Sequence, residues 1–261
     1  MTSGTMDDWR GELEVALEAA WAAGESALSF SGKAPRLTWK SDNSPVTEAD
    51  HAAEAVILDR IRRAFPDDAL LAEESGAHPG RSGRRWIVDP IDGTRWFIRG
   101  RPFWCTLIAL ETGGEIVVGV LHLPALGRLY GAARGLGAWR DGARLQVHDE
   151  PDVSRSMLAL GELDLITETL GAEVFRRLVR SVGSSSGCGA GYGAALLLDG
   201  HADAWLECDV SPWDIAPFGV LFEEAGARFT DPQGRRVWPT RSGLAAGPAL
   251  HAQLLPLVRP Q

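Results

Sequence analysis

The sequence predicts an α/β protein with two lobes, an α+β lobe over residues 1–150 and an α/β lobe over residues 151–261. Three observations predict this division. Two amphipathic helical segments open the chain, a run of strands joined by short turns follows them, and helical and strand patterns alternate beyond residue 150. Successive strands are typical of antiparallel sheet, whereas alternating helices and strands are typical of parallel α/β units.

Two helices are expected before residue 65. Apolar residues recur at helical spacing over residues 6–29, and a second such pattern covers residues 47–64 and ends before Pro66. Thr47 and Asp50 have the spacing of a variant capping box, in which each side chain accepts a hydrogen bond from the backbone of the other residue. This box alone would explain Asp50.

The remaining elements follow from apolar runs and turn residues. In the first lobe, strands are expected at residues 69–72, 86–88, 104–111, 115–123 and 128–133, followed by a hairpin turn at residues 141–142. In the second lobe, strands are expected at residues 157–160, 204–207 and 228–230, and helices at residues 168–182, through 196–198 and at 213–225. The Gly- and Ser-rich run 183–193 lacks a phosphate-loop motif, so we expect a flexible connection or close helix packing there.

Composition argues against several classes of function. The net charge of −9 disfavours nucleic acid as a partner, because phosphate backbones are bound by basic clusters. No apolar run approaches the roughly 18 residues that span a membrane, so we expect no membrane partner and a cytoplasmic protein. Three scattered cysteines without a CxxC pair predict buried thiols rather than disulfides or a zinc site.

The chemistry of the chain is expected around residues 86–94. A buried strand runs into Asp89 and Asp92, so two carboxylates lie at the exit of that strand. Pro90 stiffens the backbone between them, and the carbonyl of Ile91 can then be aimed outward as a further oxygen ligand. Oxygen ligands suit Mg²⁺ or Mn²⁺, whereas zinc prefers histidine and cysteine. The stretch therefore predicts a magnesium site.

The residues after Asp92 suit an anion. Gly93 has no Cβ, so a ligand can approach its N–H group closely. If a helix begins near Thr94, the N–H groups of Gly93 and Thr94 and the positive end of the helix dipole face the same point, where a phosphate is stabilised. Metal and phosphate would then meet in one place.

Each acidic segment also has a plain structural explanation. The two acids beside Pro90 could form a surface turn with a helix cap, and Glu73 with Glu74 could be a solvated pair at a strand end. Ser211 and Asp214 have the spacing of a helix start signal, so Asp214 could be a capping residue. The local patterns leave both explanations open.

Taken jointly, four motifs resemble the inositol monophosphatase superfamily, which also contains fructose bisphosphatases and bisphosphate nucleotidases. In chain order they are residues 44–50 (SPVTEAD), 73–75 (EES), 89–94 (DPIDGT) and 213–214 (WD). The resemblance covers nearly the whole chain. It implies a layered αβαβα sandwich and a metal-dependent phosphomonoesterase that is usually a homodimer.

The resemblance also implies roles for individual residues. Two or three Mg²⁺ ions, which Mn²⁺ could replace, would be held by oxygen ligands from Glu73, Asp89, Ile91, Asp92 and Asp214. The implied catalytic residues are Glu73, Thr94 and Asp50, with Asp50 orienting Thr94 so that Thr94 helps to activate the attacking water. The N–H groups of Gly93 and Thr94 would hold the phosphate.

Within the superfamily, the chain is most similar to the histidinol-phosphate phosphatase branch. The similar stretches are residues 83–86, 99–110, 124–127 and 209–214. Acids in the region of Glu207 and Asp209 meet the cationic amine of histidinol in that branch, whereas in the inositol branch a Glu matching Glu207 accepts hydrogen bonds from ring hydroxyls. Ser186 and Ala190 stand where the histidinol branch has an Arg and an Asp. Trp96 adds bulk beside the site.

We therefore expect hydrolysis of a small-molecule phosphate monoester by metal-activated water. L-Histidinol phosphate, from histidine biosynthesis, is the best single substrate, and inositol 1-phosphate is the alternative. A 3′(2′),5′-bisphosphate nucleotidase fits the motifs less well. The rival from another class is a catalytically silent protein that binds metal and phosphate or serves as a scaffold, which the complete set of expected ligands disfavours.

Overall fold

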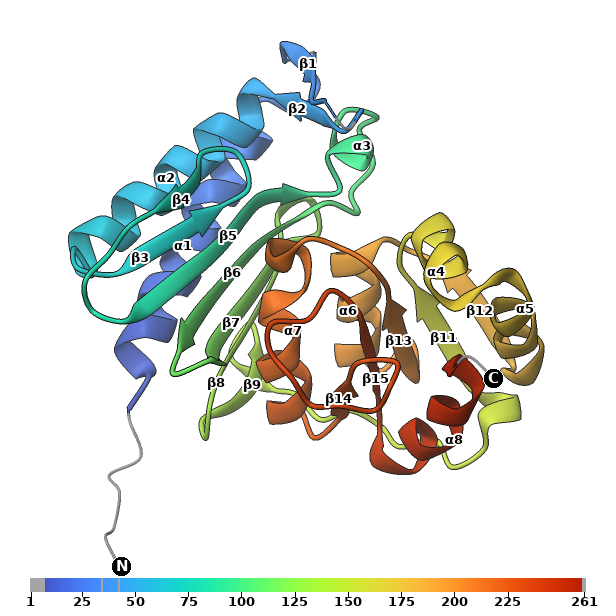
Figure 1. Cartoon of the computed structure of the whole chain (residues 1–261). Helices are drawn as coiled ribbons and strands as arrows, with labels where there is room; N and C mark the ends of the chain where they lie inside the picture. The colour runs from blue at the N-terminus through green and yellow to red at the C-terminus, as the bar shows by residue number, and fades with distance from the viewer. Residues whose placement is uncertain (1–7, 34, 42, 260–261) are drawn as a thin grey trace, which may run out of the picture.

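Five layers of helix and sheet make up the molecule. The structure is a computed structural model that describes residues 8–33, 35–41 and 43–259. Helices α1 and α2 form the first layer, an eight-stranded sheet the second, helices α6 and α7 the third, a five-stranded sheet the fourth, and helices α4, α5 and α8 the fifth (Figure 1). This order of layers is the αβαβα sandwich that the resemblance implies.

The first layer consists of two long helices that pack against each other and against one face of the first sheet. Helix α1 covers Arg10–Leu28 and α2 covers Glu48–Ala64. Both helices were predicted, and the capping box at the start of α2 is confirmed, because Thr47 and Asp50 accept the reciprocal hydrogen bonds. Close approach of α1 to its neighbours depends on small buried side chains at Ala16, Ala19, Ala20, Ala23 and Ala27.

The first sheet has the order β10-β9-β8-β7-β6-β5-β3-β4. Its strands are β3 (Ala69–Ala72), β4 (Gly76–His78), β5 (Arg84–Asp92), β6 (Cys105–Thr112), β7 (Glu115–Leu123), β8 (Arg128–Ala133), β9 (Gly137–Arg140) and β10 (Ala143–Arg144). Only the β3–β5 pair is parallel. A separate hairpin of β1 (Leu37–Trp39) and β2 (Pro45–Thr47) lies beyond the end of this sheet (Figure 1).

Side-chain alternation along β5 decides which way its acids face. Trp86 and Val88 belong to the apolar core beneath α1 and α2, whereas Ile87 belongs to the core on the opposite side, beneath α6 and α7. Because alternate residues of a strand share a face, Asp89 follows Ile87 toward the middle layer. This direction brings it toward α7.

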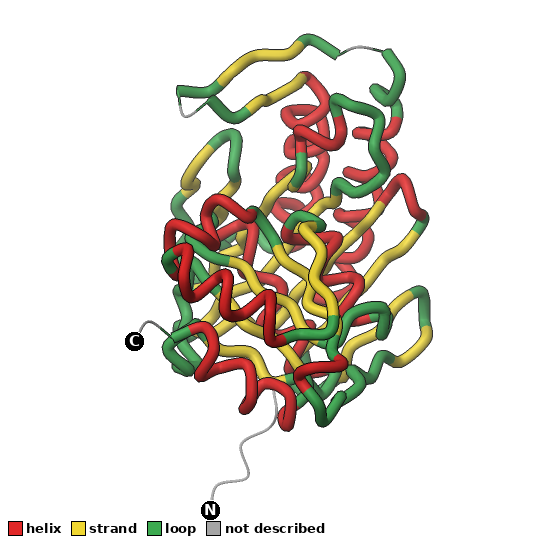
Figure 2. The backbone as a smooth tube through the Cα atoms, turned by 90° about the vertical axis from the view of Figure 1, so that its right-hand side faces the viewer, coloured by secondary structure: helices red, strands yellow, loops and turns green. Residues whose placement is uncertain are grey.

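The middle layer and the second sheet complete the molecule. Helix α6 covers Ala190–Leu198 and α7 covers Pro212–Glu224. The second sheet has the order β12-β11-β13-β15-β14, from strands β11 (Met157–Leu160), β12 (Ser184–Gly187), β13 (Ala204–Glu207), β14 (Arg228–Thr230) and β15 (Gly243–Ala246). Its outer face is covered by α4 (Leu163–Leu170), α5 (Ala172–Ser181) and α8 (Pro248–Val258), which are nearest the viewer in Figure 2.

The second lobe differs from the prediction in three respects. The single helix expected at residues 168–182 is wrong: α4 and α5 are separate helices, because Gly171 between them adopts a φ of 85° that ends the first. The run 183–193 was expected to be a flexible connection or a place of close helix packing. It contains strand β12, which pairs in parallel with β11, and the start of α6, where Gly191 is closely packed. Strand β15 and helix α8 were not predicted.

Two smaller expectations can be compared directly with the structure. All three cysteines are free thiols and buried, as predicted. Among the described residues, no helix has both the length and the apolar character needed to cross a membrane.

Candidate active site

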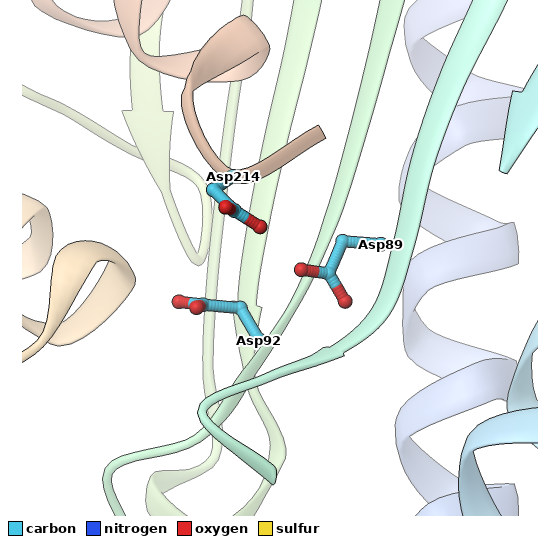
Figure 3. Close-up of side chains that lie close together, drawn as sticks. All are labelled: Asp89, Asp92 and Asp214. Atoms are coloured by element: carbon cyan, nitrogen blue, oxygen red, sulfur yellow. The ribbon is translucent and has the colours of Figure 1, made fainter. Parts of the chain in front are cut away.

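Three carboxylates from two different elements point toward one small space between the first sheet and the middle helices. Asp89 and Asp92 lie at the end of β5, and Asp214 lies in the first turn of α7 (Figure 3). One oxygen atom from each residue lies within 4.8 Å of the others. Such a group could hold a metal ion.

The turn between Asp89 and Asp92 is held by its own backbone and by the neighbouring strand. The register of β5 against β6 shifts between the two acids. The N–H of Ile91 donates to Asp89 Oδ1 at 2.9 Å, and the hydroxyl of Thr106 donates to the carbonyl of Pro90 at 2.9 Å. The shift turns Asp92 toward Asp89, so that both acids face the same space.

Asp214 is at once a helix cap and a member of the cluster. The N–H of Ser211 donates to Asp214 Oδ2 at 2.9 Å, and Ser211 and Asp214 form the capping box that the sequence indicated. The cap uses one carboxylate oxygen and leaves the other. The two explanations of this residue are therefore compatible.

Asp92 is held by one residue of the first sheet and one residue of the middle layer. Its Oδ2 accepts the thiol of Cys105 at 3.2 Å and the N–H of Gly191 at 3.0 Å. Cys105 lies on β6 and Gly191 in the first turn of α6. Neither residue was singled out from the sequence.

Burial and mutual repulsion disfavour the ionised forms of these three acids. Burial, followed by the charges of Glu73, Asp214 and Asp92, raises the pKa of Asp89 well above its usual range. Burial, followed by Asp92 and Glu73, raises the pKa of Asp214 to about 8. Burial is also the main reason why the pKa of Asp92 is raised to about 6. A cation in this space would offset the repulsion.

Glu73 reaches the same cavity from the end of β3. Its N–H donates to the carbonyl of Val88 at 3.1 Å, so Glu73 lies beside the start of the β5 turn. Lys40 bridges Glu73 and Glu74 with Nζ–Oε1 distances of 2.8 Å and 2.9 Å. Burial alone would lower the pKa of Lys40. The hydrogen bonds to these two acids outweigh burial, so the pKa of Lys40 is raised above its usual range. Glu73 and Glu74 are therefore not a solvated pair.

A buried acid on α2 fixes the turn after Glu73. The N–H groups of Glu74 and Ser75 donate to the two carboxylate oxygens of Glu54 at 2.8 Å and 2.9 Å. Glu54 is buried on the face of α2 that carries Ala53 and Ile57. An acid on that apolar face was the signal that could have drawn attention to it.

Asp50 also has two functions in the structure. Its Oδ2 accepts both the N–H and the hydroxyl of Thr47, at 2.8 Å and 2.6 Å. Its Oδ1 lies 3.2 Å from the hydroxyl of Thr94, which is also 3.1 Å from the carbonyl of Ile91. Burial raises the pKa of Asp50 despite its hydrogen bonds to Thr47. Helix capping and contact with Thr94 therefore coexist.

A cavity of about 400 Å³ lies at the acid cluster, and five acids line it: Glu73, Asp89, Asp92, Asp214 and Glu162. Asp50 does not line this cavity, although it contacts Thr94, which does. The other lining residues are Ser44, Pro45, Ile91, Gly93, Thr94, Arg95, Trp96, Arg99, Phe103 and Gly189. The ring centroids of Trp96 and Phe103 lie 6.2 Å apart in an edge-to-face arrangement. The cavity thus has an acidic side and an aromatic side.

The two acids expected to contact substrate do not lie on the cavity wall. Glu207 is fully buried, and its Oε1 accepts the N–H groups of Glu162 and Cys208 at 3.2 Å and 3.1 Å. Burial raises the pKa of Glu207 to about 8. Asp209 is exposed and pairs with Arg241 at 2.7 Å. Closeness to Asp214 along the chain therefore does not bring these side chains to the cavity.

The donor set fits a hard divalent cation. Carboxylates and the carbonyl of Ile91 are oxygen ligands, and the carbonyl keeps a second lone pair while it accepts from Thr94. Crowded acids with raised pKa values are the arrangement that such a cation stabilises. The residues present therefore suit Mg²⁺ or Mn²⁺ better than zinc.

Comparison with known proteins shows the family of this chain. Residues 8–261 match the family model described as the inositol monophosphatase family. A histidinol-phosphatase from Chlorobaculum parvum is 40% identical over 226 residues, covering 86% of this chain and 87% of that protein. An inositol-1-monophosphatase from Mesorhizobium japonicum is 33% identical over 246 residues, covering 90% and 91%.

Among solved structures, the extragenic suppressor protein suhB from Bartonella henselae aligns with a TM-score of 0.89 at 29% identity, covering 95% of this chain and 98% of that one. The fold, the cavity and the acid cluster are thus found in a chain that these proteins match over almost its whole length. The chain belongs to the inositol monophosphatase family and is a phosphoric monoester hydrolase.

Proposed function

We propose that the protein is a Mg²⁺-dependent phosphatase of a small phosphate monoester, with L-histidinol phosphate as its substrate. The observation that carries the proposal is the convergence of Asp89, Asp92 and Asp214 in a cavity that Thr94 also lines. Three acids that repel one another, beside a hydroxyl and the N–H groups of a helix start, suit a metal and a phosphate together.

Two or three Mg²⁺ ions would be held by oxygen atoms of Glu73, Asp89, Asp92, Asp214 and the carbonyl of Ile91. When bound, such ions supply positive charge for the phosphate and make a water molecule more acidic. Lys40 now occupies one oxygen of Glu73, and it would release that oxygen or share it with the metal. The N–H groups of Gly93 and Thr94 would hold phosphate oxygens.

Thr94 and Asp50 would act on the attacking water. The hydroxyl of Thr94 lies 3.2 Å from Asp50 Oδ1, so it can donate there and accept a hydrogen bond from water. The water would lose a proton and its oxygen would bond to phosphorus, while the bond from phosphorus to the ester oxygen breaks. The departing alkoxide would take up one proton, equal to the one that the water loses, and leave as the alcohol. This reaction needs positioning and charge neutralisation rather than a covalent nucleophile.

The outer wall of the cavity supports a cationic substrate with a flat ring. Among the described residues, none makes a hydrogen bond or ion pair with the carboxylate of Glu162. Arg95 and Arg99 already donate to the carbonyls of Asn43 and Arg95, at 2.9 Å and 3.1 Å. Burial raises the pKa of Glu162, and the charge of Arg95 opposes this shift. The carboxylate of Glu162, which shares the cavity wall with Trp96 and Phe103, would bind the ammonium or imidazole of histidinol. Glu162 thus takes the role first expected of Glu207 and Asp209.

Phosphate release from a panel of substrates tests both parts of the proposal. The panel is histidinol phosphate, inositol 1-phosphate, fructose 1,6-bisphosphate and adenosine 3′,5′-bisphosphate, each with Mg²⁺ and with EDTA. We expect Mg²⁺-dependent release, fastest from histidinol phosphate. In Glu162→Gln, KM for histidinol phosphate should rise about tenfold because a charge-assisted contact is lost, while KM for inositol 1-phosphate changes less than about twofold.

Glu168→Gln is the matched control, because Glu168 is an exposed acid on α4 outside the cavity. Activity that persists in EDTA would exclude the metal-dependent reaction. Equal changes for both substrates in Glu162→Gln, or a preference for inositol 1-phosphate, would remove the argument for histidinol phosphate. No release from any substrate would favour the silent metal-binding protein.

Three further expectations stay proposals. We propose a boundary between the lobes near residue 150, between β10 and β11, which belong to different sheets. We also propose a homodimer, which sedimentation at several concentrations would test, and a cytoplasmic location.

A further inference from the structure

We propose that Cys105 and Gly191 are positioning residues that hold Asp92 in the orientation needed to bind the cation. The inference rests on the proposed function only in that the acid cluster binds Mg²⁺. Both residues contact the same oxygen, Asp92 Oδ2, with the thiol at 3.2 Å and the N–H at 3.0 Å. Asp92 Oδ1 is then the oxygen that no described protein group holds.

The thiol of Cys105 is well placed to donate. Cys105 lies on β6 directly opposite Asp92 in the strand register, and none of its surface is exposed. Water therefore does not compete for the hydrogen bond.

Gly191 is the residue of α6 that allows the helix to approach. A Cβ at this position would lie 2.1 Å from Cys105 Sγ and 2.8 Å from Asp92 Oδ2. Any other residue would push one of these two side chains aside. The absence of a side chain at Gly191 thus lets one backbone N–H reach the acid.

Asp92 is held differently from the other two acids. Asp89 and Asp214 accept N–H groups of Ile91 and Ser211, two and three residues away in the chain. Gly191, in contrast, is 99 residues from Asp92 and lies on a helix of the second lobe. The orientation of Asp92 therefore depends on how α6 packs against β6. Groups that hydrogen-bond to a metal ligand commonly orient that ligand in this way.

Calorimetric titration with Mg²⁺, without substrate, tests the inference. The variants are Cys105→Ala and Cys105→Val, which lack the donor, and Cys105→Ser, which keeps one. We expect the Kd for Mg²⁺ to rise about tenfold in the Ala and Val variants and to stay within about twofold of the unmodified protein in the Ser variant. Val places one methyl group in the space of the thiol and adds a second, so it removes the donor without leaving a cavity and separates loss of the donor from loss of packing.

Cys188→Ala is the matched control. Cys188 is also a buried free thiol, but its Sγ lies 3.3 Å from the carbonyl of Ser186 rather than from an acid. Its Kd for Mg²⁺ should be unchanged. Thermal unfolding in EDTA shows whether each variant is folded, and the Val variant carries the test if the Ala variant is not.

Normal Mg²⁺ affinity in Cys105→Val would overturn the inference, as would an equal loss in Cys105→Ser and Cys105→Ala. These outcomes leave the proposed phosphatase intact. An unmodified protein that binds Mg²⁺ but releases no phosphate would contradict only the proposed function. No Mg²⁺ binding at all would remove both.

Discussion

At the scale of single residues, the acids of the site serve the fold and the site at once. Asp50 and Asp214 each complete a capping box with one carboxylate oxygen. The remaining oxygen of Asp50 contacts Thr94, and one oxygen of Asp214 joins the acid cluster. A carboxylate has enough lone pairs for both tasks. Helix capping is therefore the means by which these two side chains are oriented.

Thr94 allows a test of the proposed water-orienting role. Thr94→Ala removes the hydroxyl that contacts Asp50, and we expect kcat to fall by about 10²-fold or more while the Kd for Mg²⁺ changes little. Thr94→Ser keeps the hydroxyl and should retain most of the activity. Steady-state kinetics and Mg²⁺ titration of both variants check this, and equal activity in the Ala and Ser variants would refute the role.

At the scale of elements, the position of Asp214 depends on how closely α7 approaches the first sheet. Gly119 on β7 lies directly beneath the helix, and a Cβ there would lie 2.4 Å from the carbonyl oxygen of Pro217. We expect Gly119→Ala to destabilise the protein by about 1–3 kcal/mol and to lower turnover, because α7 and Asp214 must shift outward. Denaturant unfolding and phosphate release measure the two effects.

Gly219 on α7 provides the matched control. A Cβ there would meet Phe229 at 3.6 Å, which is an ordinary contact, and alanine is favoured over glycine within a helix. Gly219→Ala should therefore leave activity unchanged and add up to about 1 kcal/mol of stability. If both Gly→Ala variants behaved alike, close packing of α7 would not position Asp214.

Local patterns account for most of the elements but not for their tertiary partners. Helix and strand periodicity predicted α1, α2 and the strands β6–β8, because each buries one regular face. Strands β12 and β15, with sequences SSSG and GLAA, lack the β-branched residues that mark a strand. The break at Gly171 depends on a single backbone angle.

The same limit applies to the site. The acids of the cluster could be predicted because they end a strand or begin a helix that meet at the cavity. The contact of Gly191 with Asp92 spans 99 residues and leaves no local pattern. Glu207 and Asp209 were expected as substrate contacts from the resemblance to the histidinol-phosphate phosphatase branch. The acid that lies on the cavity wall is instead Glu162, two residues after the end of β11.

At the scale of the whole molecule, the layered fold brings acids from three elements together at a site where they are largely buried from water. The ends of β3 and β5 and the start of α7 meet at the cavity, and the cost of crowding their carboxylates is visible in the raised pKa values. The stability of the folded state therefore depends on whether protons or a cation neutralise these acids. This dependence links stability to pH.

We expect the protein in EDTA to lose stability as the pH rises. Burial is the main reason why the pKa of Asp92 is raised to about 6 and that of Asp214 to about 8, from an ordinary aspartate value of 3.8. Between about pH 4 and about pH 8 the folded state binds more protons than the unfolded state, so the free energy of unfolding falls with rising pH. The stabilising contribution is complete below about pH 4 and is lost as the pH passes about 6 and then about 8.

Mg²⁺ should reverse this trend, because it binds the ionised acids and only in the folded state. Between about pH 5.5 and about pH 8.5, we expect Tm in EDTA to fall on the order of 5 °C more than Tm in saturating Mg²⁺. The Asp92→Asn, Asp214→Asn double variant should lose most of the difference, since its site no longer exchanges those protons. Equal pH profiles of Tm with and without Mg²⁺ in the unmodified protein would mean that the acids are neither coupled to folding nor neutralised by the metal.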